Sequence, residues 1–383
     1  MSQTESLKSL QLVSVRWWNA SAYYGISLAD ALNRQGFPAI VAGRAGSPPL
    51  QKAQDWQLPT FTEINLESLN PAKMPGNLNA LKTLIRDQQI PLINAHRPED
   101  MAFAVLVNKL SPTKIPVIRT VSDVRPPKRR FLNKYLHQNT DYFIFSCRAS
   151  YERYQSVWPI FAERSAVIYS AIDTENFRPL PHYPELRRKL GISDNQLLIG
   201  IIARLDPVKD HDTFLKAAKT VAAEIPEARF LIAGEVCNIT WEMLDEEAKS
   251  LGIRDKLVFV PRDDAISARD LIGSLDIGVV ASNGSEVICR IAVEYMAMGK
   301  PIVSTDINVL PEIVEDGKNG LICNAGNAAQ MTAHLLQLGK NSELRQNIGE
   351  TGRQFAETKF SYPAFVSQTT EVYRQVLDRF SRR

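Results

Sequence analysis

The chain has 383 residues, of which 44% are hydrophobic and 23% are charged, with 45 Lys and Arg against 42 Asp and Glu. This composition excludes disordered and fibrous classes, and the length favours two domains over one. No run of 18 apolar residues occurs, and the N-terminus lacks the basic and apolar regions of a signal peptide, so we expect a cytoplasmic protein. The scattered cysteines predict buried, reduced thiols without a disulfide or a zinc site: Cys147, Cys237, Cys289 and Cys323.

Short apolar runs alternate with helical stretches through the first half of the chain. A helix is expected through residues 28–32, between the first two of these runs. An alternation of strands and helices is typical of a parallel, doubly wound sheet. The strands predicted here span residues 10–15, 39–42, 92–95, 117–118 and 142–146.

The same alternation restarts after residues 173–184, where Pro179, Pro181 and Pro184 predict a linker that is neither helix nor strand. The strands predicted in this half span residues 197–202, 229–233, 257–260, 277–280, 301–304 and 320–323. The fold expected is therefore α/β, with two Rossmann-like domains at 1–175 and 176–360. Two such domains leave a cleft between them, the usual place for a ligand.

The positive charge is concentrated in the first domain. Residues 1–175 carry 20 Lys and Arg against 14 Asp and Glu, and the excess gathers between residues 114 and 134. Such a cluster suits a phosphorylated acceptor, acidic lipid headgroups or a nucleic acid, although a solvated face with nothing bound would look the same. No aromatic stacking pattern accompanies the charge, so a nucleic acid is not expected. The residues taken as the anion patch are Arg125, Lys128, Arg129 and Arg130.

A helix start in the second domain is the most informative local feature. A strand ends in a small polar loop, a helix is expected to begin near Arg290, and Gly299 followed by Pro301 is the expected stop. The N–H groups of the first helical turn have no partner within the helix, and the helix dipole adds positive potential there. The backbone from Cys289 to residue 291 is therefore a candidate diphosphate site.

Charged residues surround this helix start. Glu286 precedes it and Glu294 lies within it, and carboxylates beside a phosphate site can accept hydrogen bonds from sugar and ribose hydroxyls. Arg204 and Lys209 follow the first strand of the domain, before a helix expected at 213–221. Their fixed charge would stabilise a departing diphosphate, whereas the structural alternative for Arg204 is a salt bridge at the strand end.

In combination these residues resemble glycosyltransferase family 4, whose members retain the anomeric configuration and have the GT-B architecture. The family motif R-L-x-x-x-K is matched from Arg204 to Lys209, and the E-x7-E motif from Glu286 to Glu294. Ala203 replaces the usual glycine before the arginine, and Ile288 and Cys289 replace the usual bulky and small pair after the first glutamate. Residues 361–383 resemble the family's closing helix, which crosses back to the first domain.

The resemblance implies transfer of a sugar from a nucleoside-diphosphate sugar to a glycan or lipid-linked acceptor, in the synthesis of lipopolysaccharide or another cell-envelope polysaccharide. Arg204 and Lys209 would grip the diphosphate with the backbone around Ile288, Cys289 and Arg290. Glu286 would contact the sugar, Glu294 the ribose, and the segment at Arg262 would border the base. The enzyme would need neither metal nor cofactor and would work in the cytoplasm or at the inner face of its membrane.

One departure from the family affects the first domain. Ser122 stands where many members carry a histidine, so His96 is the alternative catalytic histidine, although a lone histidine near a strand end is as often structural. A weak or inactive sugar-nucleotide-binding relative is the alternative function. Asp210 and Asp212 spell the D-x-D metal motif of another glycosyltransferase fold, but here Asp210 is expected to cap a helix. A nicotinamide enzyme would require a G-x-G-x-x-G motif, which neither domain contains.

Overall fold

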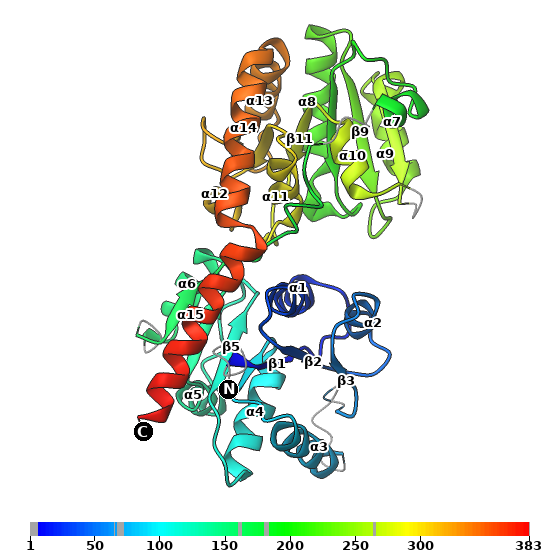
Figure 1. The fold of residues 1–383 in the computed structure, drawn as a ribbon. Helices are drawn as coiled ribbons and strands as arrows, with labels where there is room; N and C mark the ends of the chain where they lie inside the picture. The colour runs from blue at the N-terminus through cyan, green and yellow to red at the C-terminus, as the bar shows by residue number, and fades with distance from the viewer. Residues whose placement is uncertain are drawn as a thin grey trace. The chain divides into compact units, whose positions relative to one another are not determined.

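The computed structural model describes residues 7–64, 66, 73–159, 163–179, 184–262 and 266–382. The chain forms two compact units (Figure 1). Unit 1 comprises Met1–Ala171 and Tyr362–Arg383, and unit 2 comprises Ile172–Ser361. In the described ranges, no helix is both long enough and apolar enough to cross a membrane.

Unit 1 contains a seven-stranded sheet in the order β3-β2-β1-β4-β5-β6-β7, and all of its paired strands run parallel. Leu10 in the central strand aligns with Ile40 on one side and with Ile93 on the other. The strands are β1 (Ser9–Leu12), β2 (Ala39–Ala42), β3 (Thr60–Phe61), β4 (Leu92–Ala95), β5 (Val117–Val121), β6 (Tyr142–Phe145) and β7 (Ser165–Val167).

Helices cover this sheet and bury its continuous apolar strands, as expected for a parallel sheet. Leu10, Ile93, Phe143 and Phe145 belong to one buried core cluster with residues of α4. The helices of unit 1 are α1 (Ala20–Arg34), α2 (Pro48–Asp55), α3 (Met74–Asp87), α4 (Pro98–Leu110), α5 (Phe131–Gln138), α6 (Arg148–Gln155) and α15 (Tyr362–Ser381).

The last helix, α15, is an integral part of unit 1. The ring of Phe365 packs edge-on against Tyr24 of α1, with ring centroids 5.1 Å apart, and the hydroxyl of Tyr362 donates to Asp30 at 3.1 Å. The hydroxyl of Tyr373 accepts hydrogen bonds from the buried amides of Gln11 (3.1 Å) and of Asn94 in β4 (3.2 Å). Because these contacts join the two ends of the chain, removing α15 would expose the core of unit 1.

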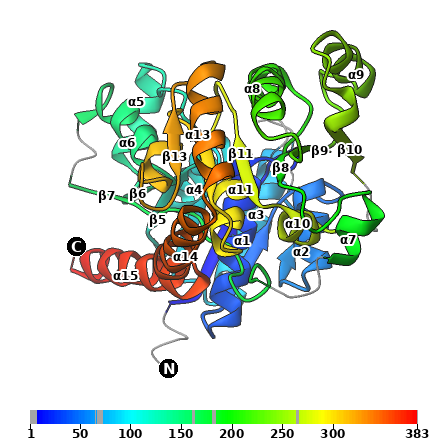
Figure 2. The ribbon, with the colours of Figure 1, turned by 90° about the horizontal axis from the view of Figure 1, so that it is seen from above.

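Unit 2 contains a six-stranded parallel sheet in the order β10-β9-β8-β11-β12-β13. Figure 2 shows α8 and α9 on one side of this sheet and α10 and α11 on the other. Its strands are β8 (Leu198–Ile202), β9 (Arg229–Gly234), β10 (Leu257–Pro261), β11 (Ile277–Val280), β12 (Ile302–Thr305) and β13 (Leu321–Cys323). Its helices are α7 (Pro184–Lys189), α8 (His211–Glu224), α9 (Trp241–Ser250), α10 (Ala268–Ser274), α11 (Arg290–Ala297), α12 (Leu310–Ile313), α13 (Ala328–Lys340) and α14 (Ser342–Lys359), with short 3₁₀ turns η3 (Pro207–Lys209) and η4 (Arg254–Lys256).

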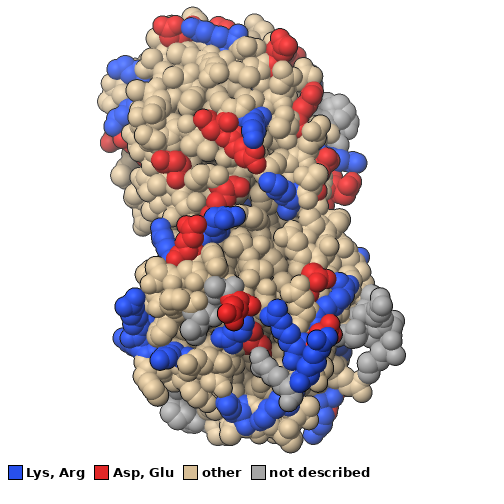
Figure 3. Space-filling model, turned by 90° about the vertical axis from the view of Figure 1, so that its left-hand side faces the viewer, with Lys and Arg blue, Asp and Glu red and all other residues tan. Residues whose placement is uncertain are grey.

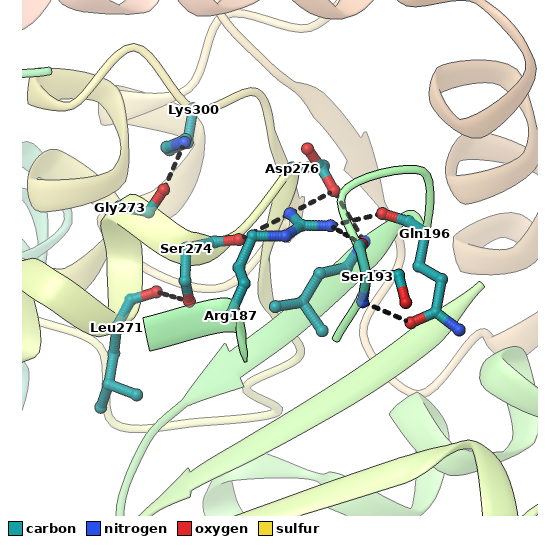
Figure 4. Close-up of polar contacts among 9 residues, drawn as sticks. Arg187, Ser193, Gln196, Leu271, Gly273, Ser274, Asp276 and Lys300 are labelled. Atoms are coloured by element: carbon teal, nitrogen blue, oxygen red, sulfur yellow. Dashed lines mark hydrogen bonds and ion pairs between the residues drawn. The ribbon is translucent and has the colours of Figure 1, made fainter. Parts of the chain in front are cut away.

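A polar cluster fastens α7 to the amino end of this sheet (Figure 4). The guanidinium group of Arg187 donates to the carbonyl oxygen of Ser274 at 3.0 Å and to the carboxylate of Asp276 at 3.1 Å. The same carboxylate accepts from the backbone N–H of Leu198, the first residue of β8, at 2.7 Å. This cluster therefore has a structural role, at the end of the sheet opposite to the loops that follow the strands.

The two-domain α/β architecture is confirmed, and each predicted strand corresponds to an observed one. The short strands β3 and β7 were not predicted. Within the predicted linker, residues 180–183 lie outside the described residues, and Pro184 is the first residue of α7 rather than part of a loop. Proline is well suited to that position because a helix does not use the N–H of its first residue.

Candidate donor site

The turn before α11 forms as the sequence predicts. The helix begins at Arg290, and Gly299 follows its end with a φ of +67°. Cys289 occupies the N-cap position in the left-handed conformation, with a φ of +39°, and its side chain is buried together with those of Val287 and Ile288. Burial of these three side chains holds the turn so that the first N–H groups of α11 lie at the carboxyl end of β11.

Glu286, in the loop between β11 and α11, forms an ion pair with Lys209 of η3. The carboxylate of Glu286 also accepts a hydrogen bond from the hydroxyl of Ser282 at 2.6 Å, and Glu286 is only 5% exposed. The segment after β8 is tied to the segment after β11 a second time, because the N–H of Asn283 donates to the carbonyl oxygen of Val208 at 3.0 Å. Strands β8 and β11 are neighbours in the sheet, which explains why residues 77 positions apart meet here.

Glu294 lies one turn inside α11 and has a different partner. Its carboxylate is buried and pairs with Nε of Arg290, four residues earlier, at 2.8 Å. Burial raises the pKa of Glu294, and the charge of Arg290 opposes that rise. The next residue, Tyr295, fixes the helix to β8, because its hydroxyl accepts from the N–H of Ile202 at 3.1 Å. The two glutamates predicted to contact the sugar and the ribose are therefore each paired with a cation of unit 2, Glu286 with Lys209 and Glu294 with Arg290.

Arg204 and Arg262 follow the strands β8 and β10, which lie on either side of β9 in the sheet. Arg204 is exposed, with Nη1 lying 4.0 Å from the sulfur of Cys237, and within the described ranges no carboxylate forms an ion pair with it. Arg262 pairs with Glu235 at 3.0 Å on the surface. The exposure of Cys237 corrects the prediction that all four cysteines are buried.

Gly234 is a site-forming residue that the sequence reasoning missed. A Cβ atom at this position would lie 1.8 Å from the carbonyl oxygen of Ala203, the residue before Arg204. Only glycine allows the end of β9 to approach the backbone of Ala203 so closely. A glycine at the end of an apolar strand was the signal that could have identified it. Ser282, which fixes the Glu286 carboxylate, carried no comparable signal.

The D-x-D segment caps a helix, as predicted. Asp210 is the N-cap of α8 and accepts from the N–H of Thr213 at 3.2 Å and from its hydroxyl at 2.8 Å. Asp212 pairs with Lys216 one turn further along. Both carboxylates therefore have partners on α8 itself.

His96 and Ser122 belong to unit 1, whereas the paired carboxylates belong to unit 2. His96 is buried at the end of β4, where its Nε2 lies 3.0 Å from the side-chain oxygen of Gln11. Burial, assisted by the charge of Arg119, lowers the pKa of His96 to about 3, so its imidazole is neutral at ordinary pH. The Nδ1 atom of His96 and the hydroxyl of Ser122 are buried without hydrogen-bond partners among the described residues.

Asp100, in the first turn of α4, is a buried carboxyl group that the sequence analysis did not single out. One of its oxygens accepts from the N–H of Ser14 at 3.3 Å, and the other is without a hydrogen-bond partner in the described part of the chain. Burial raises the pKa of Asp100 to about 7, although Arg97, the Ser14 hydrogen bonds and Arg119 all favour the ionised form.

We expect Asp100→Asn to change how the stability of unit 1 depends on pH. The pKa in the folded protein lies above the ordinary value, so the folded state keeps a proton that the unfolded state releases between pH 4 and 7. The free energy of unfolding of the wild type should therefore fall by up to about 4 kcal/mol as the pH rises from 4 to 7. The asparagine variant has no carboxyl group at this position and should not show this fall. Urea unfolding at pH 4.5 and pH 8 measures this difference. Asp194→Asn, at an exposed position of unit 2, is the control, and an equal pH dependence of Asp100→Asn and the wild type would contradict the prediction.

The predicted anion patch lies on the segment between β5 and α5. Arg125, Lys128, Arg129 and Arg130 are all exposed. Arg125 pairs with Asp123, with Nε 2.7 Å from the carboxylate. Figure 3 shows Lys and Arg side chains spread over one face of unit 1, in the lower part of the picture.

Two parallel α/β sheets, each with its own helices and loops at the carboxyl ends of its strands, define the GT-B class of glycosyltransferases. Residues 22–176 match the family described as Glycosyltransferase Family 4, and residues 182–355 match the family described as Glycosyl transferases group 1. The chain belongs to glycosyltransferase family 4.

Individual relatives are distant. The chain is 27% identical over 196 residues to N-acetyl-alpha-D-glucosaminyl L-malate synthase of Bacillus anthracis, covering 50% of this chain and 49% of that protein. It is 28% identical over 261 residues to D-inositol 3-phosphate glycosyltransferase of Corynebacterium urealyticum, covering 66% and 60%. The chain thus spans between about half and three fifths of the length of these two relatives. Among solved structures, Anabaena HepE in complex with UDP matches this chain with a TM-score of 0.81 and a sequence identity of 19%. The match covers 96% of this chain and 100% of that chain, and it shows that the two share a fold.

Proposed function

We propose that this chain is a retaining glycosyltransferase that moves a sugar from a nucleoside-diphosphate sugar to a hydroxyl group of a glycan or lipid-linked acceptor. The observation that carries the proposal is the Lys209–Glu286 ion pair beside the start of α11, with Ser282 holding the carboxylate. A cation, a carboxylate and a helix start in one place match the diphosphate and the hydroxyl groups of such a donor.

In the proposed reaction the bond between the anomeric carbon and the diphosphate oxygen breaks, and a bond from the acceptor oxygen to that carbon forms. Negative charge then accumulates on the departing diphosphate. Arg204, Lys209 and the first N–H groups of α11 stabilise that charge, which is the task that a metal ion performs in other transferases, so no metal is required. The acceptor loses its proton to the leaving phosphate on the face from which the phosphate departs, which preserves the anomeric configuration.

The other donor contacts follow the family pattern. Glu286 accepts hydrogen bonds from the sugar hydroxyls, Glu294 from the ribose, and the segment at Arg262 borders the base. Ile288, Cys289 and Arg290 supply the turn around the diphosphate. His96 is neutral, so in a catalytic role it would orient a hydroxyl group rather than supply a positive charge.

The acceptor is proposed to be an acidic or lipid-linked glycan of the cell envelope, such as lipopolysaccharide, used at the inner face of the cytoplasmic membrane. The exposed basic residues of unit 1 support an acidic acceptor. The names of two relatives, which contain malate and inositol 3-phosphate, point to acidic compounds as well.

A ligand that binds only the folded state raises its stability, so a thermal-shift screen tests the donor half of the proposal. We expect one nucleoside diphosphate and its sugar derivative to raise Tm by several degrees, and slow hydrolysis of that sugar nucleotide to follow. No shift with any nucleotide would contradict the proposal. Binding without turnover of any donor, in the presence of acceptor extracts, would favour the alternative of a weak or inactive relative. The observation that supports this alternative is Ser122 in place of a histidine, with its hydroxyl group lacking a hydrogen-bond partner among the described residues.

A further inference from the structure

The helix α5 carries an exposed apolar face. Phe131 is 88% exposed, Leu132 64% and Tyr135 40%. Residues three and four apart share one face of a helix, so the three side chains stand together, while Leu136 and His137 are buried against the rest of unit 1. Isolated exposed apolar residues are normal, but three on a single short helix form a patch that indicates an interaction surface.

Cationic side chains flank this apolar face along the chain. Lys128 and Arg130 precede the helix, Lys134 lies within it, and all three are exposed. Among the residues that the structure describes, no carboxylate forms an ion pair with any of them. We call these three residues, together with Phe131, Leu132 and Tyr135, the α5 surface.

The position of these charges opposes the stability of the helix. The N-terminus of a helix carries a partial positive charge and favours acidic residues in its first turn. The first turn of α5 contains no acidic residue, and the N-cap residue, Arg130, makes no capping hydrogen bond with its side chain. Basic residues therefore gather where the helix disfavours them, and an external anion is the partner that would compensate.

We propose that the α5 surface docks on an anionic phospholipid bilayer, with Phe131 and Leu132 entering the boundary between headgroups and acyl chains. Lys128, Arg130 and Lys134 contact the lipid phosphates, and Tyr135 lies at the headgroup level, where its ring and hydroxyl group are both accommodated. This surface deepens the proposed function, on which it rests, because it brings unit 1 to the membrane that would hold a lipid-linked acceptor.

A bilayer fits this surface better than other acidic partners do. An eight-residue helix is only about 12 Å long, so its exposed face is small beside the roughly 800 Å² per partner of a stable protein interface. A single-stranded nucleic acid needs a row of aromatic side chains for its bases, whereas the aliphatic Leu132 offers no stacking face. Adjacent apolar and basic side chains on one helix face are the pattern of interfacial attachment.

The test is sedimentation of the full chain with phosphatidylcholine vesicles, with and without phosphatidylglycerol, whose anionic headgroups give the vesicle surface a negative potential. Wild-type protein should sediment with the anionic vesicles and remain in solution with the neutral ones. The double variant Phe131→Ser, Leu132→Ser should weaken vesicle binding about tenfold or more. The triple variant Lys128→Gln, Arg130→Gln, Lys134→Gln should weaken vesicle binding by a similar factor and remove its salt dependence. Met243→Ser, and Lys219→Gln with Lys249→Gln and Lys340→Gln, are the matched controls at exposed positions of unit 2 and should bind as the wild type does.

Failure of wild-type protein to bind anionic vesicles would overturn the proposal, as would equal binding by the α5 variants and the controls. Binding to DNA or RNA that depends on Lys128, Arg130 and Lys134, in the absence of vesicle binding, would replace the bilayer with a nucleic acid. Circular dichroism shows whether each variant is folded. The thermal shift with nucleoside diphosphates separates the two proposals: a shift without vesicle binding rejects the α5 surface alone, and vesicle binding without a shift rejects the donor site alone.

Discussion

Glu286→Gln is expected to lower the rate of sugar transfer by about 100- to 1,000-fold while leaving nucleoside-diphosphate binding intact. Glutamine has the same size and can still accept from Ser282, but it lacks the negative charge that pairs with Lys209 and that favours hydrogen bonds from sugar hydroxyls. Initial rates with the donor found by thermal shift measure the first effect, and calorimetry with the nucleoside diphosphate measures the second.

Glu343→Gln is the matched control, because Glu343 is an exposed glutamate at the start of α14 in the same unit. It should keep the wild-type rate. A near-normal rate for Glu286→Gln would reject the assignment of this carboxylate to the sugar. Loss of nucleoside-diphosphate binding in the same variant would instead show that Glu286 maintains the diphosphate site itself.

Gly234→Ala is expected to destabilise unit 2 by about 2–3 kcal/mol and to weaken nucleotide binding. The added methyl group would collide with the carbonyl oxygen of Ala203, a backbone atom that cannot rotate away, so the ends of β8 and β9 must separate. Arg204 follows Ala203 directly and would move with it. For a unit of this size the change corresponds to a fall in Tm of roughly 5–10 °C, which differential scanning calorimetry can measure.

Gly76→Ala in α3 is the control for the loss of glycine, since nothing lies within 4 Å of a Cβ atom at that position. Alanine should be neutral there, or stabilising by up to about 1 kcal/mol, because it favours the helix. If Gly234→Ala has the same small effect as Gly76→Ala, the close approach of β9 to Ala203 is not required by the fold.

The sequence was sufficient to predict the two α/β units because buried parallel strands are continuous apolar runs. The helix start at Arg290 and its end before Gly299 could be predicted for a similar local reason: capping and stop signals lie within a few residues of the ends. The strands β3 and β7 are only two and three residues long, too short for such a run to be recognised. Pro184 was assigned to a linker because a proline that opens a helix and a proline in a loop look alike in sequence.

The pairing within the candidate site was not predictable in the same way. The roles expected for Lys209 and Glu286 came from a family pattern, in which each residue contacts a ligand. Their mutual ion pair depends on β8 and β11 being neighbours in the sheet, a non-local fact. The burial of His96 beside Gln11, which makes its imidazole neutral, likewise depends on packing that no spacing of residues records.

The Lys209–Glu286 pair has a consequence for selectivity under the proposed assignment. Without donor, each charge already has its counter-charge, so a lone phosphate gains little at Lys209 and a lone sugar gains little at Glu286. A ligand that supplies both a diphosphate and hydroxyl groups compensates both residues in a single event. The empty site would then discriminate against the free anions and free monosaccharides that surround it, and it would favour a molecule in which the two groups are covalently joined.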